Sequence, residues 1–293
     1  MRCRRQCCTP DVMKRIIVTG AAGQLGTTIA SDYATRATIV PATRQVLDLG
    51  DGPAIEAFIS RARPDVVINC AAYNDVDGAE DHAVDALRVN ALAVRAMARA
   101  ATDVGAVFVH YGTDFVFDGS TQQRPYTEEH DPAPQSVYAS SKLLGEWFAA
   151  DCPQHYVLRV ESLFGGARRR SSVDRIVDAI RKGEPARVFV DRTVTPSYVG
   201  DVAEATWTLL QTGAAFGVYH CVNTGVTTWY ELAAEIGRIL GVEPNLVAVK
   251  VADVPMKARR PQYAALSNDK LREAGIAMPT WQDALRRYLG GSS

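Results

Sequence analysis

The segment KRIIVTGAAGQLG (14–26) joins a short apolar run to a turn with three glycines. The run 14–19 is rich in β-branched residues and is typical of a buried strand, and residues 24 to about 33 favour a helix. A dinucleotide fingerprint requires this context, because glycines let the backbone approach a pyrophosphate and the helix N-terminus offers N–H groups. We predict that the turn binds a dinucleotide through Gly20, Gly23, Gln24, Leu25 and Gly26, although the spacing is GxxGxxG.

Strand-like and helix-like segments alternate through the rest of the first half. We expect strands at 37–42, 65–70 and 106–111, and helices at 55–62 and over most of 75–101. This alternation with short connections predicts an α/β fold built on a Rossmann-like doubly wound parallel sheet.

Ligands of such sheets bind beyond the carboxyl ends of the strands, where Gly23, Ala71 and Thr113 fall. The small residues after the strand 65–70 allow a cofactor to lie close to the backbone. Asn90 lies among apolar residues of a predicted helix, so it must find partners, either structural ones or the cofactor. The predicted cofactor contacts here are Cys70, Ala71, Ala72, Tyr73 and Asn90.

The end of the second predicted strand sets the choice between the two nicotinamide cofactors. NAD enzymes usually place an acidic residue there to hold the ribose 2′-hydroxyl, but this chain has Thr43 and Arg44. Arg44 is suited to a 2′-phosphate, so we predict NADP(H) in preference to NAD(H); the alternative is a solvated surface arginine. Asp48 and Leu49 are candidates for the adenine edge.

Tyr138 and Lys142 stand four residues apart in VYASSK (137–142), within a segment that favours a helix. An i,i+4 pair shares one helical face. A free tyrosine has a pKa near ~10, and a neighbouring ammonium is expected to lower it. The pair therefore predicts a proton donor adjusted to neutral pH, although such pairs also occur by chance on helices.

Composition limits the other possibilities. The chain has 293 residues, a net charge of −1 and 47% hydrophobic residues, so no global field recruits nucleic acid or an anionic membrane. No apolar run approaches ~18 residues. Three of the six cysteines lie in the Arg-rich start, which lacks the apolar centre of a signal peptide. The scattered others (Cys70, Cys152, Cys221) fit reduced thiols in a cytoplasmic protein.

The second half predicts a smaller layer over the sheet. Helices are expected at 173–182, 202–211 and 228–240, and strands at 187–190, 217–223 and 246–251. We expect residues 1–13 to be a disordered leader with Met13 a possible start. Residues 14–165 and 187–223 would form the NAD(P)-binding Rossmann domain, and 166–186 and 224–293 a smaller C-terminal α/β substrate-binding domain.

The chain resembles the dTDP-4-dehydrorhamnose reductase (RmlD-like) family of the extended short-chain dehydrogenase/reductase superfamily. The motifs that carry the resemblance are GAAGQLG (20–26), PDVVINCAAYNDVDGAE (64–80), VNALA (89–93), TDFVFDG (113–119), PYTEE (125–129), YASSKLLGE (138–146), GVYHCVNTGVTTWYELA (217–233) and ARRP…LSNDKL (258–271).

The resemblance implies an NAD(P)H-dependent reductase of the C4 ketone of a nucleoside-diphosphate 4-keto-6-deoxysugar. Tyr138 would protonate the developing alkoxide, Lys142 would hold the nicotinamide ribose, and Thr113 would hydrogen-bond the same oxygen. The implied substrate contacts are Thr113, Asp114, Phe115, Tyr138 and Ser162. Arg260 is a further candidate, as an anchor for the diphosphate.

Departures from the family pattern fall on the expected substrate side. Gly112 stands where the family has Ser, and RVESLFG (159–165) replaces the usual RTSWVYG, so that Ser162 takes the place of a tryptophan. DRTVTPS (191–197) replaces the pattern DQxGxPT. These changes leave the particular sugar open.

Two other functions share these residues. One is an NDP-sugar 4-epimerase or another NDP-sugar reductase, because the same Tyr–Lys pair serves those reactions. The other is a non-catalytic, cofactor-binding regulatory subunit. Family members pair through helices beside the sheet, sometimes with Mg²⁺, so a homodimer is possible; no carboxylate cluster in the sequence supports a metal site.

Overall fold

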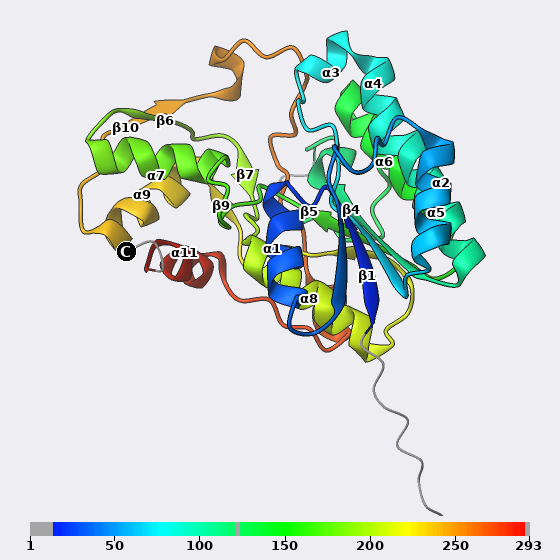
Figure 1. Cartoon of the computed structure of the whole chain (residues 1–293). Helices are drawn as coiled ribbons and strands as arrows, with labels where there is room; N and C mark the ends of the chain where they lie inside the picture. Colours follow the sequence, from blue (N-terminus) through cyan, green and yellow to red (C-terminus); the bar gives the residue numbers. More distant parts are fainter. Residues whose placement is uncertain (1–13, 121–123, 291–293) are drawn as a thin grey trace, which may run out of the picture.

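A six-stranded parallel sheet forms the centre of the computed structural model, which describes residues 14–120 and 124–290 (Figure 1). The strand order is β2-β1-β3-β4-β5-β8. The chain leaves β1 for β2 on one side and returns to β3 on the other, so the sheet has its switch point between β1 and β3. The predicted doubly wound sheet is confirmed. Its strands are β1 (Arg15–Thr19), β2 (Thr38–Ala42), β3 (Val66–Asn69), β4 (Val107–Thr113), β5 (His155–Val160) and β8 (Gly217–His220).

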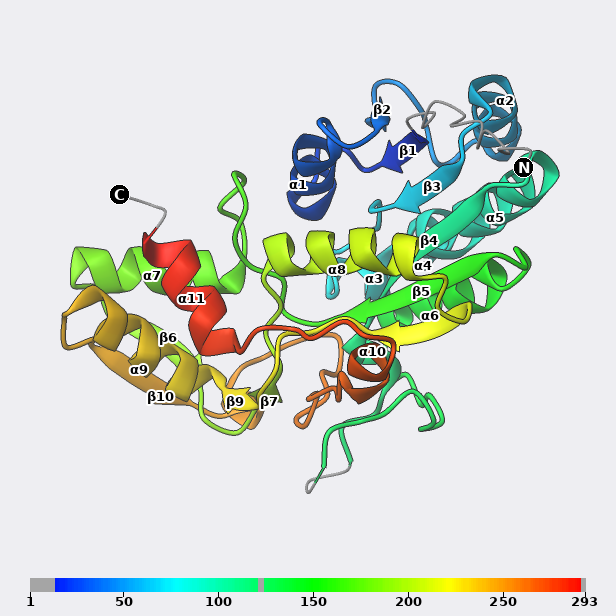
Figure 2. The ribbon, with the colours of Figure 1, turned by 90° about the horizontal axis from the view of Figure 1, so that it is seen from below.

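Helices cover both faces of this sheet, which explains why its central strands are apolar throughout rather than alternating (Figure 2). One face packs against α1 (Gln24–Tyr33), α8 (Val199–Thr212) and α10 (Asp269–Glu273). The other packs against α2 (Gly52–Ala62), α5 (Ala93–Val104) and α6 (Val137–Ala149). As expected, residues 217–220 return to the sheet, where β8 pairs with β5.

The segment 75–101, expected to be mainly one helix, is divided. It forms α3 (Gly78–Asp81), α4 (Ala83–Leu87) and a π-helical turn at Arg88–Leu92 before α5 begins. His82 leaves the helical region, with φ −122° and ψ 46°, and separates α3 from α4. Short π-helical turns often occur at functional sites; here the turn carries Asn90, which holds the loop at Tyr73.

A smaller layer stands beside the carboxyl end of the sheet (Figure 1). Its helices α7 (Ser172–Lys182), α9 (Trp229–Leu240) and α11 (Trp281–Gly290) share one core with β6 (Ala186–Phe189), which pairs with β10 (Leu246–Val249). A short ribbon of β7 (Thr193–Val194) and β9 (Thr227–Thr228) lies next to it. Trp229 and Trp281 are buried in this core. Capping boxes at Ser171 and Thr228 start α7 and α9.

The division into two domains stays a prediction, but the strand pairings show which segments belong to the central sheet. The strand near 187, which we assigned to the cofactor domain, pairs with β10 and not with the central sheet. The leader 1–13 lies outside the described residues. Within residues 14–120 and 124–290, Cys70, Cys152 and Cys221 are free thiols, no His, Cys, Asp or Glu group is arranged to hold a metal, and no helix is long and apolar enough to cross a bilayer.

Candidate active site

The glycine turn after β1 presses directly against the loop after β3. Gly20 has φ +62°, and a Cβ there would lie 2.7 Å from the backbone N of Ala71. A Cβ at Gly26 would lie 2.3 Å from the carbonyl oxygen of Gly20, so the first turn of α1 packs on the strand end. Gly23 is the N-cap of α1. Glycine at 20 and 26 therefore brings the α1 N-terminus to the switch point, where its N–H groups suit a phosphate.

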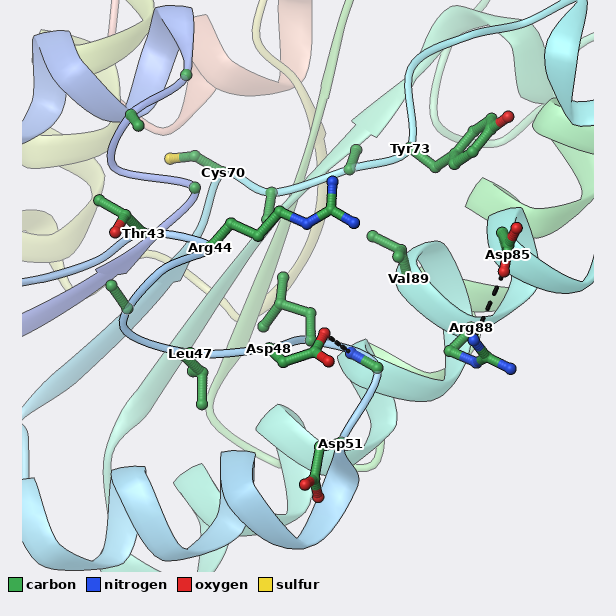
Figure 3. Close-up of a pocket in the computed structure, with 18 of the residues that line it drawn as sticks. Thr43, Arg44, Leu47, Asp48, Asp51, Cys70, Tyr73, Asp85, Arg88 and Val89 are labelled. Carbon is green, nitrogen blue, oxygen red and sulfur yellow. Dashed lines mark hydrogen bonds and ion pairs between the residues drawn. The ribbon is translucent and has the colours of Figure 1, made fainter. Parts of the chain in front are cut away.

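A cavity of about 900 Å³ extends from this turn past the end of β2 (Figure 3). Figure 3 shows the Arg44 side chain extended across it toward Val89. Arg44 is exposed and has no hydrogen bond or ion pair within the described part of the chain. The predicted residues that line the cavity are Gly20, Gly23, Arg44, Asp48, Leu49, Cys70, Ala71, Ala72 and Tyr73.

Two charged residues of this cavity make contacts within the protein. The Asp48 carboxylate accepts a hydrogen bond from the Gly50 N–H at 2.8 Å and so shapes the loop it lies in. Arg88, which the sequence analysis missed, also lines the cavity and lies 3.5 Å from Asp85. Its place on the π-helical turn carried no sequence signal, because the segment was expected to be regular helix.

Asn90 lies outside the lining of this cavity. It is 1% exposed, its side-chain oxygen accepts from the Tyr73 N–H at 2.8 Å, and its amide donates to the Tyr73 carbonyl at 3.1 Å and to Ser141 Oγ at 2.9 Å. Asn90 therefore ties the cofactor-side loop to α6, and its contact with the cofactor stays a prediction without support from this arrangement.

A second cavity of about 550 Å³ continues from the glycine turn to the smaller layer. Its wall brings together Thr113 at the end of β4 and Tyr138 and Lys142 on α6, which starts at the Ser136 cap. The Thr113 hydroxyl hydrogen-bonds with Tyr138 and donates to Asp114 Oδ1 at 3.0 Å. The three predicted catalytic residues thus share one cleft with the nucleotide cradle.

The electrostatics of the tyrosine differ from the expectation. Burial and the nearby Asp114 carboxylate raise the pKa of Tyr138, partly offset by its hydrogen bond with Thr113. The Lys142 ammonium donates to the Tyr111 carbonyl at 2.6 Å, and burial lowers its own pKa to about 8. The expectation that Lys142 lowers the pKa of Tyr138 is therefore wrong for this chain's own residues. Tyr138 is held protonated at neutral pH, as a proton donor must be.

The predicted substrate-side residues also line the second cavity: Thr113, Asp114, Phe115, Tyr138, Ser162 and Arg260. Gln24 and Leu25 lie at its cofactor end. Ser162 has φ +47°, which is unusual for a residue with a Cβ. Arg260 already makes a bidentate pair with Asp77, with both N···O distances at 2.8 Å, and this pair lowers the Asp77 pKa to about 2.

A buried ion pair lies beneath the site and packs against Gly112, which stands where the family has serine. Arg159 on β5 donates to Glu146 on α6 through Nε at 3.0 Å and Nη2 at 2.8 Å, and both side chains are at most 5% exposed. A Cβ at Gly112 would lie 2.2 Å from Glu146 Oε1. Gly112 therefore leaves room for the carboxylate.

Residues 13–292 match the family model described as the RmlD substrate binding domain. The dTDP-4-dehydrorhamnose reductase of Mycobacterium tuberculosis is 37% identical over 94% of this chain and 92% of its own length. The same enzyme of Burkholderia thailandensis is 34% identical over 92% of this chain and 96% of its own. A crystal structure of the Bacillus anthracis dTDP-4-dehydrorhamnose reductase in complex with NADP is 31% identical, covers 95% of this chain and 99% of that one, and superimposes with a TM-score of 0.90.

Proposed function

Because this chain belongs to the RmlD substrate-binding-domain family, we propose that it reduces the C4 ketone of a dTDP-linked 4-keto-6-deoxysugar with NAD(P)H. The observation that carries the proposal is the meeting of Thr113, Tyr138 and Lys142 in one cleft that is continuous with the glycine turn. The glycine turn is suited to bind a dinucleotide, and a protonated tyrosine can donate the proton that reduction of a carbonyl requires.

The chain's own residues supply proton and charge. A bound nicotinamide supplies the hydride. We propose that Tyr138 transfers its proton to the developing alkoxide and that the Thr113 hydroxyl, when it turns from Asp114, donates to the same oxygen. The raised pKa of Tyr138 makes its phenolate costly. We propose that Lys142, which lines the same cavity, holds the nicotinamide ribose through its ammonium.

The proposal is tested with purified protein, NADPH and dTDP-4-dehydrorhamnose. We expect one cofactor to be oxidised per sugar reduced, with the product identified by NMR. The alternatives are an NDP-sugar 4-epimerase and another NDP-sugar reductase. An epimerase would regenerate its bound cofactor and show no net oxidation of NADPH. A regulatory subunit would show no turnover, but the retained Thr113, Tyr138 and Lys142 weigh against that role.

We propose NADP(H) as the preferred cofactor, because Arg44 is a free guanidinium at the position where an acid would hold a ribose hydroxyl. Arg44→Ala should raise the KM for NADPH roughly tenfold and change that for NADH little, since charge-assisted hydrogen bonds contribute about 1.5–3 kcal/mol and this one is solvent-exposed. Arg61→Ala, on the exposed end of α2, is the matched control. Equal increases in the KM for NADPH and for NADH would contradict a contact between Arg44 and the 2′-phosphate.

The alkaline limit of activity should follow Lys142. Its pKa is about 8, so its positive charge is present below that pH and is lost as the pH rises above it. We expect kcat/KM to fall progressively above about pH 8, whereas a lysine with an ordinary pKa would sustain activity to about pH 10. Initial rates at saturating NADPH measure this. A profile that stays flat to about pH 10 would contradict the assignment.

We also propose a cytoplasmic homodimer. The free thiols fit a reducing compartment. Large apolar side chains are exposed on α4, the π-helical turn and α6, with Val84 68%, Leu92 53% and Trp147 62% exposed. Light scattering after size exclusion should give twice the chain mass, and Trp147→Glu should give the monomer. A wild-type monomer at micromolar concentration would remove this proposal.

A further inference from the structure

Three buried side chains, each with one polar atom that has no hydrogen-bond partner, lie at the sugar end of the second cavity or directly behind its wall. Arg192, just before β7, lines the cavity and makes no hydrogen bond or ion pair with any residue in 14–120 or 124–290. Its buried Nε atom has no acceptor, and its guanidinium lies 5.5 Å from the ring centre of Phe115. Asp114 Oδ2 and Glu161 Oε1 are also buried without a donor.

Asp114 and Glu161 are each held in place by a hydrogen bond to the other carboxylate oxygen. Asp114 Oδ1 accepts from the Thr113 hydroxyl at 3.0 Å. Glu161, behind the cavity wall, accepts from the backbone N of Thr195 at 2.6 Å and from its hydroxyl. Asp114 and Glu161 both interact electrostatically with Arg192. Unpaired polar groups cost free energy when buried, so an oriented set of them in a cleft points to a ligand that completes it.

We propose that Arg192 and Asp114 together bind the hydroxyl on the sugar carbon next to the reacting ketone, and that Arg192 is a specificity-determining residue. This inference rests on the proposed function. In a 6-deoxysugar with its ketone at C4, the neighbouring C5 carries the methyl group and the ring oxygen. The hydroxyl in question is therefore the one at C3.

The chemistry of the two side chains selects a hydroxyl. Arg192 offers only donors, and an ionised Asp114 offers only acceptors. A hydroxyl satisfies both, since it accepts from the guanidinium and donates to Asp114 Oδ2. A second ketone would leave Asp114 unpaired. A sugar carboxylate would add a second negative charge beside the ionised Asp114, against one guanidinium.

The position of the site relative to the proton donor selects the adjacent carbon. The Thr113 hydroxyl contacts both Tyr138 and Asp114, so only one hydroxyl separates the Asp114 carboxylate from the atom that protonates the C4 oxygen. Tyr138 and Asp114 are therefore close enough for each to contact one of two oxygens on neighbouring ring carbons. Burial raises the pKa of Asp114 only to about 6, which keeps this carboxyl mainly ionised, and therefore an acceptor, at neutral pH.

Binding of two reduced sugars tests the inference without relying on turnover. The ligands are dTDP-6-deoxyhexose with its C3 hydroxyl and its 3-deoxy analogue, titrated calorimetrically into protein saturated with NADP⁺. The wild type should bind the hydroxylated ligand about 10–100-fold more tightly, as expected for a hydrogen bond to a charged group. Arg192→Met should reduce this ratio to about threefold or less, and Arg192→Lys should restore part of it.

The matched control is Arg175→Met, which removes an arginine from the wall of the same cavity and should leave the ratio unchanged. Thermal melting and NADPH binding establish that each variant is folded. An equal ratio in wild type and Arg192→Met would overturn the inference, whether or not the protein turns over a ketone. If the wild type prefers the hydroxylated ligand and Arg192→Met loses that preference, but no cofactor is oxidised, the result counts against the proposed function and supports the role of Arg192.

Discussion

Tyr138→Phe should lower kcat by about 10²- to 10⁴-fold, the range that general acid catalysis contributes. The phenylalanine ring fills the same space against Phe115, with which Tyr138 makes an edge contact at 5.6 Å, so the fold should be kept. Only the proton and the hydrogen bond with Thr113 are lost. The affinity for NADPH should stay within about threefold, because the glycine turn and the cavity beside β2 are unchanged.

Tyr230→Phe makes the same chemical change at an exposed position on α9 and should have no effect on kcat. Single-turnover rates with saturating NADPH separate the chemical step from product release. Parallel losses of turnover and of cofactor affinity in Tyr138→Phe would mean that the tyrosine shapes the cleft and does not act as the acid.

Glu146→Ala should destabilise the protein by about 3–5 kcal/mol, the usual cost of leaving a buried charge without its partner. Arg159 would keep its place over the Phe117 ring, at 5.1 Å, and near His220, neither of which neutralises its charge. Burial lowers the pKa of His220 to about 3, so that ring is neutral and offers no compensating charge. Urea unfolding followed by circular dichroism measures the change.

The double variant Glu146→Leu with Arg159→Met tests the reason for this loss. It removes both charges and keeps apolar volume between α6 and β5, so its stability should lie much closer to the wild type than that of Glu146→Ala. A loss below about 1 kcal/mol in Glu146→Ala would show that water reaches Arg159, which its 5% exposure argues against.

Local patterns in the sequence predicted most elements of the fold. The strand, glycine turn and helix at 14–33 form as expected, and so do α6 with its Tyr–Lys pair and the helix α9. The largest local difference is the region 78–92, where a π-helical turn interrupts the helix. Within that turn Asn90 hydrogen-bonds to the Tyr73 backbone, a contact between separate segments that residue periodicity does not predict.

The sequence by itself determined the sheet and the strand, glycine turn and helix at 14–33, because these depend on residues within a few positions of one another, and it predicted Tyr138 as the proton donor. Tertiary structure alone decided the charge state of the site. Burial together with Asp114 raises the pKa of Tyr138, Lys142 faces a carbonyl instead of the phenol, and Asp77 neutralises Arg260 across 183 positions of the chain. Desolvation and Coulomb interactions depend on which side chains are brought together in space, and the spacing of residues along the chain does not encode that.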